Sequence, residues 1–580
     1  MTTAISALPF REIWVADFEF NAEPGQRPVP VCLVARELKS NASLAIWQGE
    51  LRLLRAPPYR IDHDALFVAF YASAEIGCHL ALGWPAPART LDLFTEFRVL
   101  TNGLPTMAGN SLVGALIHHG LDAISVAEKD EMRRLVLRGG PWTDAERAAI
   151  IEYCASDVDG LARLLPVMLP TILNRPHGLG QSLLRGRAMA ALAAIEHNGV
   201  PIDVPTFERL GAGWEHIRDR LIADIDRDFG VFDGRTFKAD RFAAYLARQG
   251  LPWPRLASGV LDLSDDAFRE MARAHPVISP LRELRTSLSA LRLSDLTVGA
   301  DGRNRTILSA FRARTIRNAP SNTKFVFGPS TWLRSLIKPP LGTGVAYIDY
   351  SSQEFGIAAA LSGDRRMIEA YQSGDVYLAF AKQAALAPET ATKASHPTVR
   401  DLCKTVVLGI GYGMEAESLS SRIGKSPAHA RELISLHRQT YPTFWRWSQG
   451  AADVALLNGS ISTVFGWVLH IGGDVNERSI RNFPCQANAA EMLRLASCLG
   501  IERGIEICAP VHDAVLIVAP LDRLEADIEI MRMAMAEASR VVLDGFECRT
   551  DVTVVRYPDR YSDPRGVVMW RKVANLLSLG

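Results

Sequence analysis

The hydrophobic and polar positions between residues 344 and 364 follow the order of a strand, a turn and a helix. Residues 345–348 (VAYI) form a short apolar, β-prone run that ends at Asp349. Glu354 follows, and a helical segment rich in small residues ends at Gly363. A strand that delivers an acid next to a packed helix is a rigid support for the metal ligands of a phosphoryl-transfer site. An ordinary strand, turn and helix with solvent-facing acids explains this stretch equally well when it is taken alone.

The first part of the chain alternates in a way that predicts an α/β domain. Residues 13–20 (IWVADFEF) alternate as a strand, so Asp17 and Glu19 point to the same face. Residues 28–35 and 66–71 predict two further strands. Residues 148–159 predict a helix, on which Tyr153 and Asp157 are four apart and share a face.

Four acids from these separate elements form a candidate metal site: Asp17, Glu19, Glu75 and Asp157. Carboxylate oxygens are the ligands that hard divalent cations prefer, and two such ions can activate water and stabilise a leaving oxygen. Tyr153 would orient the attacking water. Each of these short patterns also recurs by chance, so the hypothesis depends on their order and spacing together.

The middle of the chain predicts a domain boundary followed by a helical domain. Pro and Gly interrupt the helical pattern between residues 165 and 178, where we expect the first domain to end. A predicted helix over residues 189–198 terminates at Gly199. Amphipathic helices are expected from residue 206 onward, one of them with a capped start at Ser264. Such helices with a basic flank could grip a duplex, although a generic helical domain fits the same spacing.

Two cations, a leucine and a tyrosine fall on one face of a predicted helix within residues 400–413. Arg400, Lys404 and Leu408 are four apart, and Tyr412 continues the row. Arg gives a forked contact to phosphate and Lys a point charge, so the pair could grip a triphosphate. The leucine and the tyrosine could cover a base. A solvated basic stripe is the alternative.

A predicted β-hairpin over residues 509–518 carries His512 and Asp513 in its polar turn. A His-Asp pair in a turn is common without any catalytic role. Together with Asp349, however, Asp513 supplies the two carboxylates that a two-metal site requires.

Composition narrows the class of protein. The chain has 580 residues, which predicts about three or four domains, and its 48% hydrophobic and 22% charged residues are typical of globular proteins. It contains no run of 18 apolar residues and no basic start followed by an apolar core, so we expect a cytoplasmic protein without a signal peptide. Eight cysteines without a CxxC pair argue against zinc and against a disulfide framework.

Charge is balanced overall, with 64 basic and 64 acidic residues, but it is uneven along the chain. Residues 281–338 hold eleven Lys and Arg, among them Arg292 and Arg317, against three acids. A stretch with this excess of positive charge could follow a phosphate backbone. A solvated basic face that is balanced elsewhere is the alternative.

The first domain resembles the DEDD exonuclease superfamily, in the tyrosine-containing form found in the proofreading domains of family A DNA polymerases. Asp17 and Glu19 match the first motif, and Tyr153 and Asp157 match the third. Glu75 stands where the middle motif normally has Asp. The resemblance implies a 3′–5′ exonuclease with these four acids as metal ligands and Tyr153 as a catalytic residue.

The later motifs resemble the polymerase part of the same family, of the bacterial DNA polymerase I type without the 5′-nuclease domain. Motif A (D-Y-S-Q-I-E) matches at Asp349, Tyr350, Ser351 and Glu354, motif B (RxxxKxxxxGxxYG) at residues 400–413, and motif C (H-D-E) at His512 and Asp513, where Ala514 departs. The resemblance implies Asp349 and Asp513 as catalytic metal ligands. Lys404 or His512 would assist protonation and charge balance.

Nucleotide and DNA contacts are also implied by the resemblance. The nucleotide-binding positions are Gln353, Glu354, Tyr377, Arg400, Lys404, Leu408 and Tyr412, and the DNA-binding positions are Arg317, Arg478, Asn482 and Gln486. Glu354 would exclude ribonucleotides by crowding the sugar 2′ position. Leu408 stands where the family usually has Phe or Tyr, and Tyr377 where a phosphate-binding His is common. We therefore expect nucleotide selectivity to differ from the family norm.

The expected fold class is α/β and α+β multidomain, with an RNase H-like exonuclease domain followed by a right-hand polymerase. Residues 1–178 would form the exonuclease domain, 179–305 the thumb, 306–375 and 451–580 the two parts of the palm, and 376–450 the fingers. The expected enzyme is a monomeric, template-directed DNA polymerase with 3′–5′ exonuclease activity. It would use primer-template DNA, dNTPs and two Mg²⁺ ions per active site, with Mn²⁺ as a substitute.

Three rival hypotheses remain from the sequence. The first is a DNA-binding accessory protein that keeps a degenerate polymerase fold, which Ala514 favours and the co-occurrence of the other motif residues opposes. The second is a stand-alone exonuclease, opposed by the intact motif B. The third is an RNA-synthesising enzyme of the same fold, opposed by Glu354.

Overall fold

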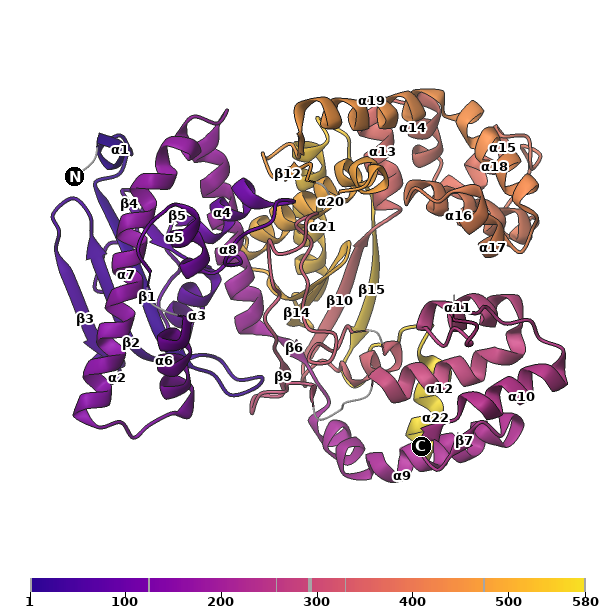
Figure 1. The fold of residues 1–580 in the computed structure, drawn as a ribbon, viewed down its shortest axis with the longest axis horizontal. Coiled ribbons are helices and arrows are strands. Elements are labelled where there is room, and N and C mark those ends of the chain that lie inside the picture. Colours follow the sequence, from indigo (N-terminus) through magenta and orange to yellow (C-terminus); the bar gives the residue numbers. More distant parts are fainter. Residues whose placement is uncertain are drawn as a thin grey trace.

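The structure, a computed structural model, describes residues 3–123, 126–256, 258–290, 295–328, 330–472 and 475–577. Arg292 of the basic stretch lies outside these residues. Figure 1 shows a first domain at one end, a central sheet, and two groups of helices that face each other at the other end. Among the described residues, no helix combines the length and the apolar character needed to span a membrane.

A five-stranded sheet in the order β3-β2-β1-β4-β5 forms the centre of the first domain. Its strands are β1 (Glu12–Asn21), β2 (Val29–Glu37), β3 (Ser43–Trp47), β4 (Ala65–Ala69) and β5 (Thr90–Asp92). β1 pairs antiparallel with β2 and parallel with β4. The three strands expected from the alternating pattern are therefore present, with Ala16 and Phe18 buried and Asp17 and Glu19 half-buried on the other face of β1.

Seven helices in the described residues surround this sheet: α1 (Thr3–Ser6), α2 (Gln48–Leu51), α3 (Ser73–Ala81), α4 (Leu93–Thr101), α5 (Leu112–His118), α6 (Val126–Arg138) and α7 (Asp144–Leu173). α7 packs along β1 and β2. It begins with a capping box, because the Thr143 hydroxyl accepts from the Glu146 backbone N–H and the Glu146 carboxylate accepts from the Thr143 backbone.

The helical pattern was expected to be interrupted over residues 165–178, but α7 is not interrupted at its first proline there. It continues through Pro166 and Pro170 and ends at Leu173. A proline inside a helix removes a backbone donor and costs about 3 kcal/mol. Packing offsets this cost, because the neighbouring side chains lie in the core of the first domain: Leu164, Leu165, Met168, Leu169 and Ile172. Residues 174–177 form the non-helical connection between α7 and the next helix.

α8 (Gly178–Asn198) joins the first domain to the rest of the molecule. It contacts α3 and β5 on the first-domain side, and α20 (Glu477–Glu502) and β13 (Glu506–Val511) on the other. Ala188, Met189 and Leu192 of α8 belong to one hydrophobic cluster that contains residues of both parts. The helix ends at Gly199 with a φ of 68°, as the sequence predicts.

One of the two helical groups in Figure 1 consists of α9 (Val204–Phe229), α10 (Ala239–Gln249), α11 (Asp265–Ala274), η1 (Pro276–Ile278), α12 (Ser279–Ala290) and the C-terminal α22 (Val567–Leu576). Two short strands, β7 (Phe232–Asp233) and β8 (Thr236–Phe237), connect α9 to α10. The Ser264 hydroxyl accepts from the Ala267 N–H at 3.2 Å, which is the expected cap of α11. Trp332 of η3 (Thr331–Leu336) stacks near both Trp214 of α9 and Trp570 of α22, so these helices are fixed to the central part.

The central sheet has four antiparallel strands in the order β13-β14-β10-β15. The strands not yet given are β10 (Thr343–Tyr350), β14 (Ala514–Pro520) and β15 (Thr550–Arg556). Asp349 of β10 lies opposite Ala514 of β14 on one side and opposite Asp551 of β15 on the other. α20 and α21 (Leu524–Val542) pack on this sheet. Smaller pairs join β6 (Val200–Pro201) to β9 (Arg303–Asn304) and β11 (Ser460–Ser462) to β12 (Val468–His470).

The second helical group comes from the segment after β10. Its helices are α13 (Gln353–Ser362), α14 (Arg365–Gln372), α15 (Val376–Gln383), α16 (Pro397–Gly411), α17 (Ala416–Ile423), α18 (Pro427–Thr440) and α19 (Pro442–Asn458). α17 contacts α11 of the first group. The strand-then-helix expected at residues 345–363 is present as β10 and α13, and the helix expected within residues 400–413 is α16.

Candidate active sites

A cavity of about 940 Å³ lies where the ends of β10 and β13 meet α13, α16 and α20. Most residues predicted for a polymerase site line it: Arg317, Asp349, Gln353, Glu354, Tyr377, Leu408, Tyr412, Arg478, Asn482, His512 and Asp513. Arg400, Lys404 and Gln486 are not among the residues that line this cavity. The structure therefore brings together residues that are separated by almost 200 positions in the sequence. Arg400 and Lys404 lie beside the cavity, next to its lining residue Tyr377.

Asp349 and Asp513 are held next to each other by the central sheet. Val511 pairs with Ala514, which leaves His512 and Asp513 as a two-residue hairpin turn. His512 has a φ of 57°, in the left-handed region that few side chains adopt. The Tyr350 N–H donates to the Asp513 carbonyl at 3.1 Å and fixes the turn against the end of β10.

Unbalanced negative charge characterises this end of the sheet. Burial, together with the nearby charges of Asp513 and Asp551, raises the pKa of Asp349 to about 6. Burial also raises the pKa of Asp513. Carboxylates in such surroundings are stabilised by a bound cation, and their oxygens fit a hard divalent ion. Asp551 was missed in the sequence because its position opposite Asp349 depends on strand pairing.

The expected face of α16 is present beside the cavity. Leu408 is 38% exposed, and Lys404 is exposed one turn before it. The Tyr377 ring lies below both cations, with its centroid 5.5 Å from Arg400 Cζ and 5.8 Å from Lys404 Nζ. Arg400 Nε donates to Asp375, which also caps α15. Asp375 was missed, although an acid directly before a helical run is a typical N-cap signal.

Glu354 and Gln353 differ in what their side chains offer to the cavity. Arg317 Nη2 donates to Glu354 Oε1 at 2.5 Å, so the two predicted residues form an ion pair. Gln353 is buried, and its Nε2 donates to the Ala489 carbonyl at 3.4 Å. The amide group of Gln353 therefore bonds to the protein and is not directed into the open part of the cavity.

Two of the predicted DNA-binding residues anchor the end of α16. Arg478 Nε and Asn482 Nδ2 both donate to the Tyr412 carbonyl, at 2.7 and 3.2 Å. Gln486 follows on the same helix, α20, one turn further along. A second cavity, of about 680 Å³, also includes Arg317 and His512 and is lined by three further arginines: Arg334, Arg494 and Arg565.

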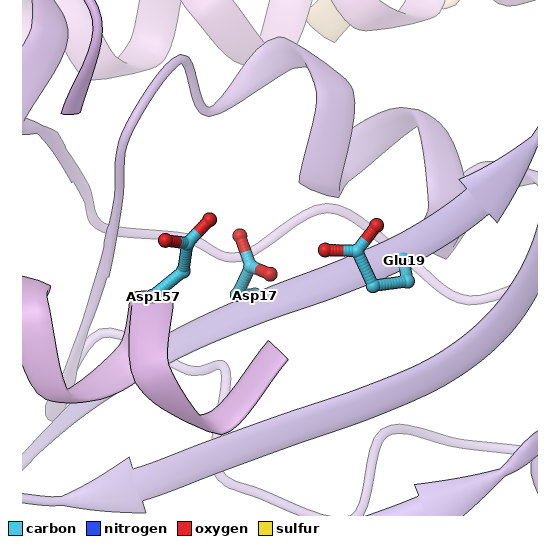
Figure 2. Close-up of side chains that lie close together, drawn as sticks. All are labelled: Asp17, Glu19 and Asp157. Atoms are coloured by element: carbon cyan, nitrogen blue, oxygen red, sulfur yellow. The ribbon is translucent and has the colours of Figure 1, made fainter. Parts of the chain in front are cut away.

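A separate group of acids lies in the first domain. Figure 2 shows Asp17 and Glu19 on β1 and Asp157 on α7, with their carboxylates turned toward one shared space. One oxygen from each lies within 4.8 Å of the others. Burial and the nearby charge of Asp157 together raise the pKa of Asp17 to about 8, and burial also raises that of Glu19. These oxygens are a suitable donor set for a divalent ion.

The fourth predicted ligand, Glu75, lies near these acids, because burial and the charges of Asp17, Glu19 and Asp157 raise its pKa. Glu75 is buried, and its Oε2 accepts from the Phe18 backbone N–H at 2.7 Å. It lies outside the group of three carboxylates, so its role as a ligand stays a prediction. Lys129 of α6 was missed in the sequence. Its Nζ donates to Asp157 at 2.7 Å and lies 5.6 Å from the centroid of the Tyr153 ring.

Comparison with known proteins agrees with this architecture. Residues 318–554 match the model of DNA polymerase family A. "DNA polymerase I, thermostable" of Thermus aquaticus is 25% identical over 499 residues, covering 78% of this chain and 57% of the relative. DNA polymerase I of Deinococcus radiodurans is 29% identical over 556 residues, covering 88% and 55%. The chain thus spans a little over half the length of these relatives.

A solved structure shares the fold across nearly the whole chain. It is the POL domain of Pol1 from M. smegmatis in complex with DNA primer-template and dNTP, with a TM-score of 0.72 and 17% sequence identity, covering 94% of this chain and 95% of that one. The chain has the multidomain α/β fold of that structure. Its residues 318–554 are similar to DNA polymerase family A.

Proposed function

We propose that this chain is a template-directed DNA polymerase that adds dNMPs to a primer 3′ end. The observation that carries the proposal is the cavity in which Asp349 and Asp513 meet Glu354 and Tyr412. The family of the matched segment supports the same conclusion. The chemistry is the attack of a primer 3′-hydroxyl on the α-phosphate of a dNTP, with pyrophosphate as the leaving group.

Family A polymerases use divalent metal ions, and the carboxylates of the cavity fit them. Asp349 and Asp513 would hold two Mg²⁺ ions, which when bound supply positive charge for the 3′-hydroxyl and for the leaving pyrophosphate. The turn that carries Asp513 is fixed against β10 by the Tyr350 N–H and keeps the two carboxylates in fixed positions. A carboxamide at either position would keep the shape but lose the negative charge.

The cations of α16 would bind the triphosphate. Lys404 lies on its exposed face, Arg400 is mostly covered and paired with Asp375, and the Tyr377 ring contacts both cations. Lys404 Nζ would donate a proton to the leaving pyrophosphate. His512, whose pKa burial lowers, would be neutral and would contact the primer end.

Other residues of the cavity would sense the shape of the base pair and the type of sugar. Glu354, fixed by Arg317, would crowd the sugar 2′ position and exclude ribonucleotides. Leu408 and Tyr412 would cover the base and the sugar. Arg317, Arg478, Asn482 and Gln486 would contact primer and template, and the second, arginine-lined cavity offers a neighbouring path for phosphates.

Primer extension tests the polymerase proposal. The full chain with Mg²⁺ should extend a primer with dNTPs and much less with rNTPs. Asp349→Asn and Asp513→Asn should each lower the extension rate about a thousandfold, because a charge-stabilising group of the transition state is lost. Binding of primer-template, measured by fluorescence anisotropy, should stay within about threefold of the wild type.

Asp522→Asn is the matched control, because Asp522 is an exposed acid on the loop after β14. It should leave extension unchanged. A wild-type chain that binds DNA but extends no primer with either nucleotide would favour the accessory protein instead. Full extension by the Asp349 and Asp513 variants would contradict the assigned site.

A 3′–5′ exonuclease in the first domain is the second candidate function. The grouping of Asp17, Glu19 and Asp157 around one space favours it. These carboxylates would hold the metal ions, and Tyr153, next to them on α7, would orient water. Lys129 would have to leave Asp157 or share it with the ion. Asp17→Asn should abolish degradation of a mispaired 3′ end in a gel assay and leave extension intact, whereas persistent degradation in Asp17→Asn would locate the nuclease elsewhere.

A further inference from the structure

The central sheet offers an acidic residue that the sequence motifs do not mark. Motif C ends at Ala514, so the hairpin turn contributes Asp513 alone. Ala514 is fully buried opposite Asp349, on the β14 side. On the other side of Asp349, the facing residue of β15 is Asp551. β14 thus lacks a carboxylate beside Asp349, and β15 provides one in Asp551.

Antiparallel pairing places Asp551 on the same face as Asp349. Directly opposite residues on neighbouring antiparallel strands have Cβ atoms about 4.5–5.5 Å apart and point the same way. The pairing runs without a register shift from Gly344 with Arg556 to Tyr350 with Thr550, so Asp551 is fixed in this position. The negative charge of Asp551 is close enough to contribute to the raised pKa of Asp349.

Asp551 is both oriented and accessible. Ser351 Oγ donates to Asp551 Oδ2 at 2.6 Å, which fixes one carboxylate oxygen. The residue is exposed, and no salt bridge with Arg or Lys joins it in the part of the chain that the structure describes. Its remaining lone pairs are therefore free for a cation.

We infer that Asp551 supplies the third carboxylate of the polymerase metal site, in place of the acid that Ala514 lacks, and that Ser351 positions it. The inference rests on the proposed polymerase function. Asp551 would bind an ion held by Asp349 directly or through one of its waters, and Asp349 would be the central ligand between Asp513 and Asp551. Ser351 is a positioning residue, since it acts through the carboxylate that it holds.

Metal binding in the assembled complex tests this inference apart from turnover. The full chain is mixed with a primer-template that ends in a dideoxynucleotide and with the next dNTP, and bound Mn²⁺ is measured by electron paramagnetic resonance. Asp551→Asn should raise the Mn²⁺ dissociation constant about tenfold, as expected for a lost carboxylate contact. Ser351→Ala should raise it about threefold. The Mg²⁺ concentration for half-maximal extension should rise in the same order.

Two further variants separate a metal ligand from a generic surface acid. Asp559→Asn is the matched control, because Asp559 is an exposed acid just after β15, and its Mn²⁺ affinity should equal that of the wild type. Ala514→Glu added to Asp551→Asn should recover at least a third of the lost affinity, because it returns a carboxylate to the other side of Asp349. Circular dichroism establishes that each variant is folded.

The outcomes distinguish this inference from the proposed function. Wild-type Mn²⁺ affinity in Asp551→Asn, in a wild type that binds Mn²⁺ and extends primers, overturns the role of Asp551 alone. A wild-type chain that binds no Mn²⁺ in the complex and extends no primer overturns both. A tenfold weaker affinity that Ala514→Glu restores supports the inference.

Discussion

His437 of α18 shows how a single buried group couples stability to pH. The side chain is fully buried, and its ring centroid lies 5.2 Å from that of Phe380 and 4.9 Å from that of Tyr441. Its Nδ1 accepts from Trp445 Nε1 at 3.1 Å, which requires the unprotonated nitrogen. Burial lowers the pKa of His437 to about 3. The folded chain therefore keeps this histidine neutral well below neutral pH.

The stability contributed by a neutral His437 should be lost as the solution is acidified. The unfolded chain binds a proton near pH 6.5 and the folded chain near pH 3, so the unfolded state is favoured increasingly below pH 6.5. Between pH 7 and pH 5 the loss is about 2 kcal/mol. His437→Gln should remove this share of the pH dependence in urea unfolding curves. An identical slope for variant and wild type would show that His437 titrates normally.

At the scale of single residues, the sequence predicts acids within continuous motifs and misses acids that become neighbours through pairing. Asp349 and Asp513 follow apolar strands and are recognisable by their position in a short pattern. Asp551 depends on the register of β15 against β10, which local alternation does not determine. Lys129 comes from α6, a helix without any catalytic pattern.

At the scale of elements, one glycine allows α8 to lie against β5. A Cβ on Gly186 would fall 1.9 Å from the Thr90 carbonyl oxygen, a backbone atom that cannot move aside cheaply. Gly180, earlier in the same helix, has open space around its Cβ position. The contact of α8 with the sheet of the first domain therefore depends on position 186.

Substitution of these two glycines should have opposite effects on stability. Gly186→Ala should lower the free energy of unfolding by about 1–3 kcal/mol, because the helix must shift away from β5. Gly180→Ala should raise it by up to about 1 kcal/mol, because Ala is the better helix former. Urea unfolding monitored by circular dichroism compares the two. Equal changes in the free energy of unfolding of the two variants would show that α8 can move away from β5 without a loss of stability.

Element prediction from the sequence succeeds where periodicity and caps agree and is wrong where packing overrides a local signal. The strands at β1, β2 and β4 and the cap of α11 are present as expected. The interruption expected over residues 165–178 does not occur at Pro166 or Pro170, because buried leucines of α7 stabilise the helix beyond the cost of its two prolines.

At the scale of the whole molecule, a buried ion pair joins the first domain to the polymerase part. Arg185 of α8 donates through Nε and Nη2 to the two oxygens of Glu96 of α4, at 2.6 and 3.0 Å. Its Nη1 donates to the Phe465 carbonyl at 3.1 Å, between β11 and β12. Arg175 also donates to Glu96. Arg185 therefore joins three parts of the chain: α8, α4 through Glu96, and the β11–β12 turn through Phe465.

Removal of the Glu96 charge should destabilise the molecule as a whole. Glu96→Gln leaves the buried Arg185 without a counter-charge, which costs about 3–5 kcal/mol. Glu502→Gln is the control, since Glu502 forms an exposed pair with Arg187 and such pairs contribute at most about 1 kcal/mol. Urea midpoints of the two variants should differ clearly. Indistinguishable midpoints would contradict the structural role of the buried pair.

The sequence could not predict how the first domain is attached. The domain boundary at residue 178 stays a prediction, and the structure shows that α7 ends at Leu173 and α8 begins at Gly178. The apolar residues of α8, however, complete a hydrophobic cluster with the first domain and with the central part. When a helix is apolar on several sides, its sequence pattern does not indicate which elements pack against it.

For anyone who wishes to engineer this chain, the shared cluster around α8 decides which truncations are practical. Cutting the gene before α8 to remove the first domain would uncover the side of α8 that packs against α3 and β5. The truncated product would then expose apolar surface and tend to aggregate. Point substitution at Asp17 silences the candidate nuclease activity without uncovering that surface, so it is the better route to a nuclease-deficient form.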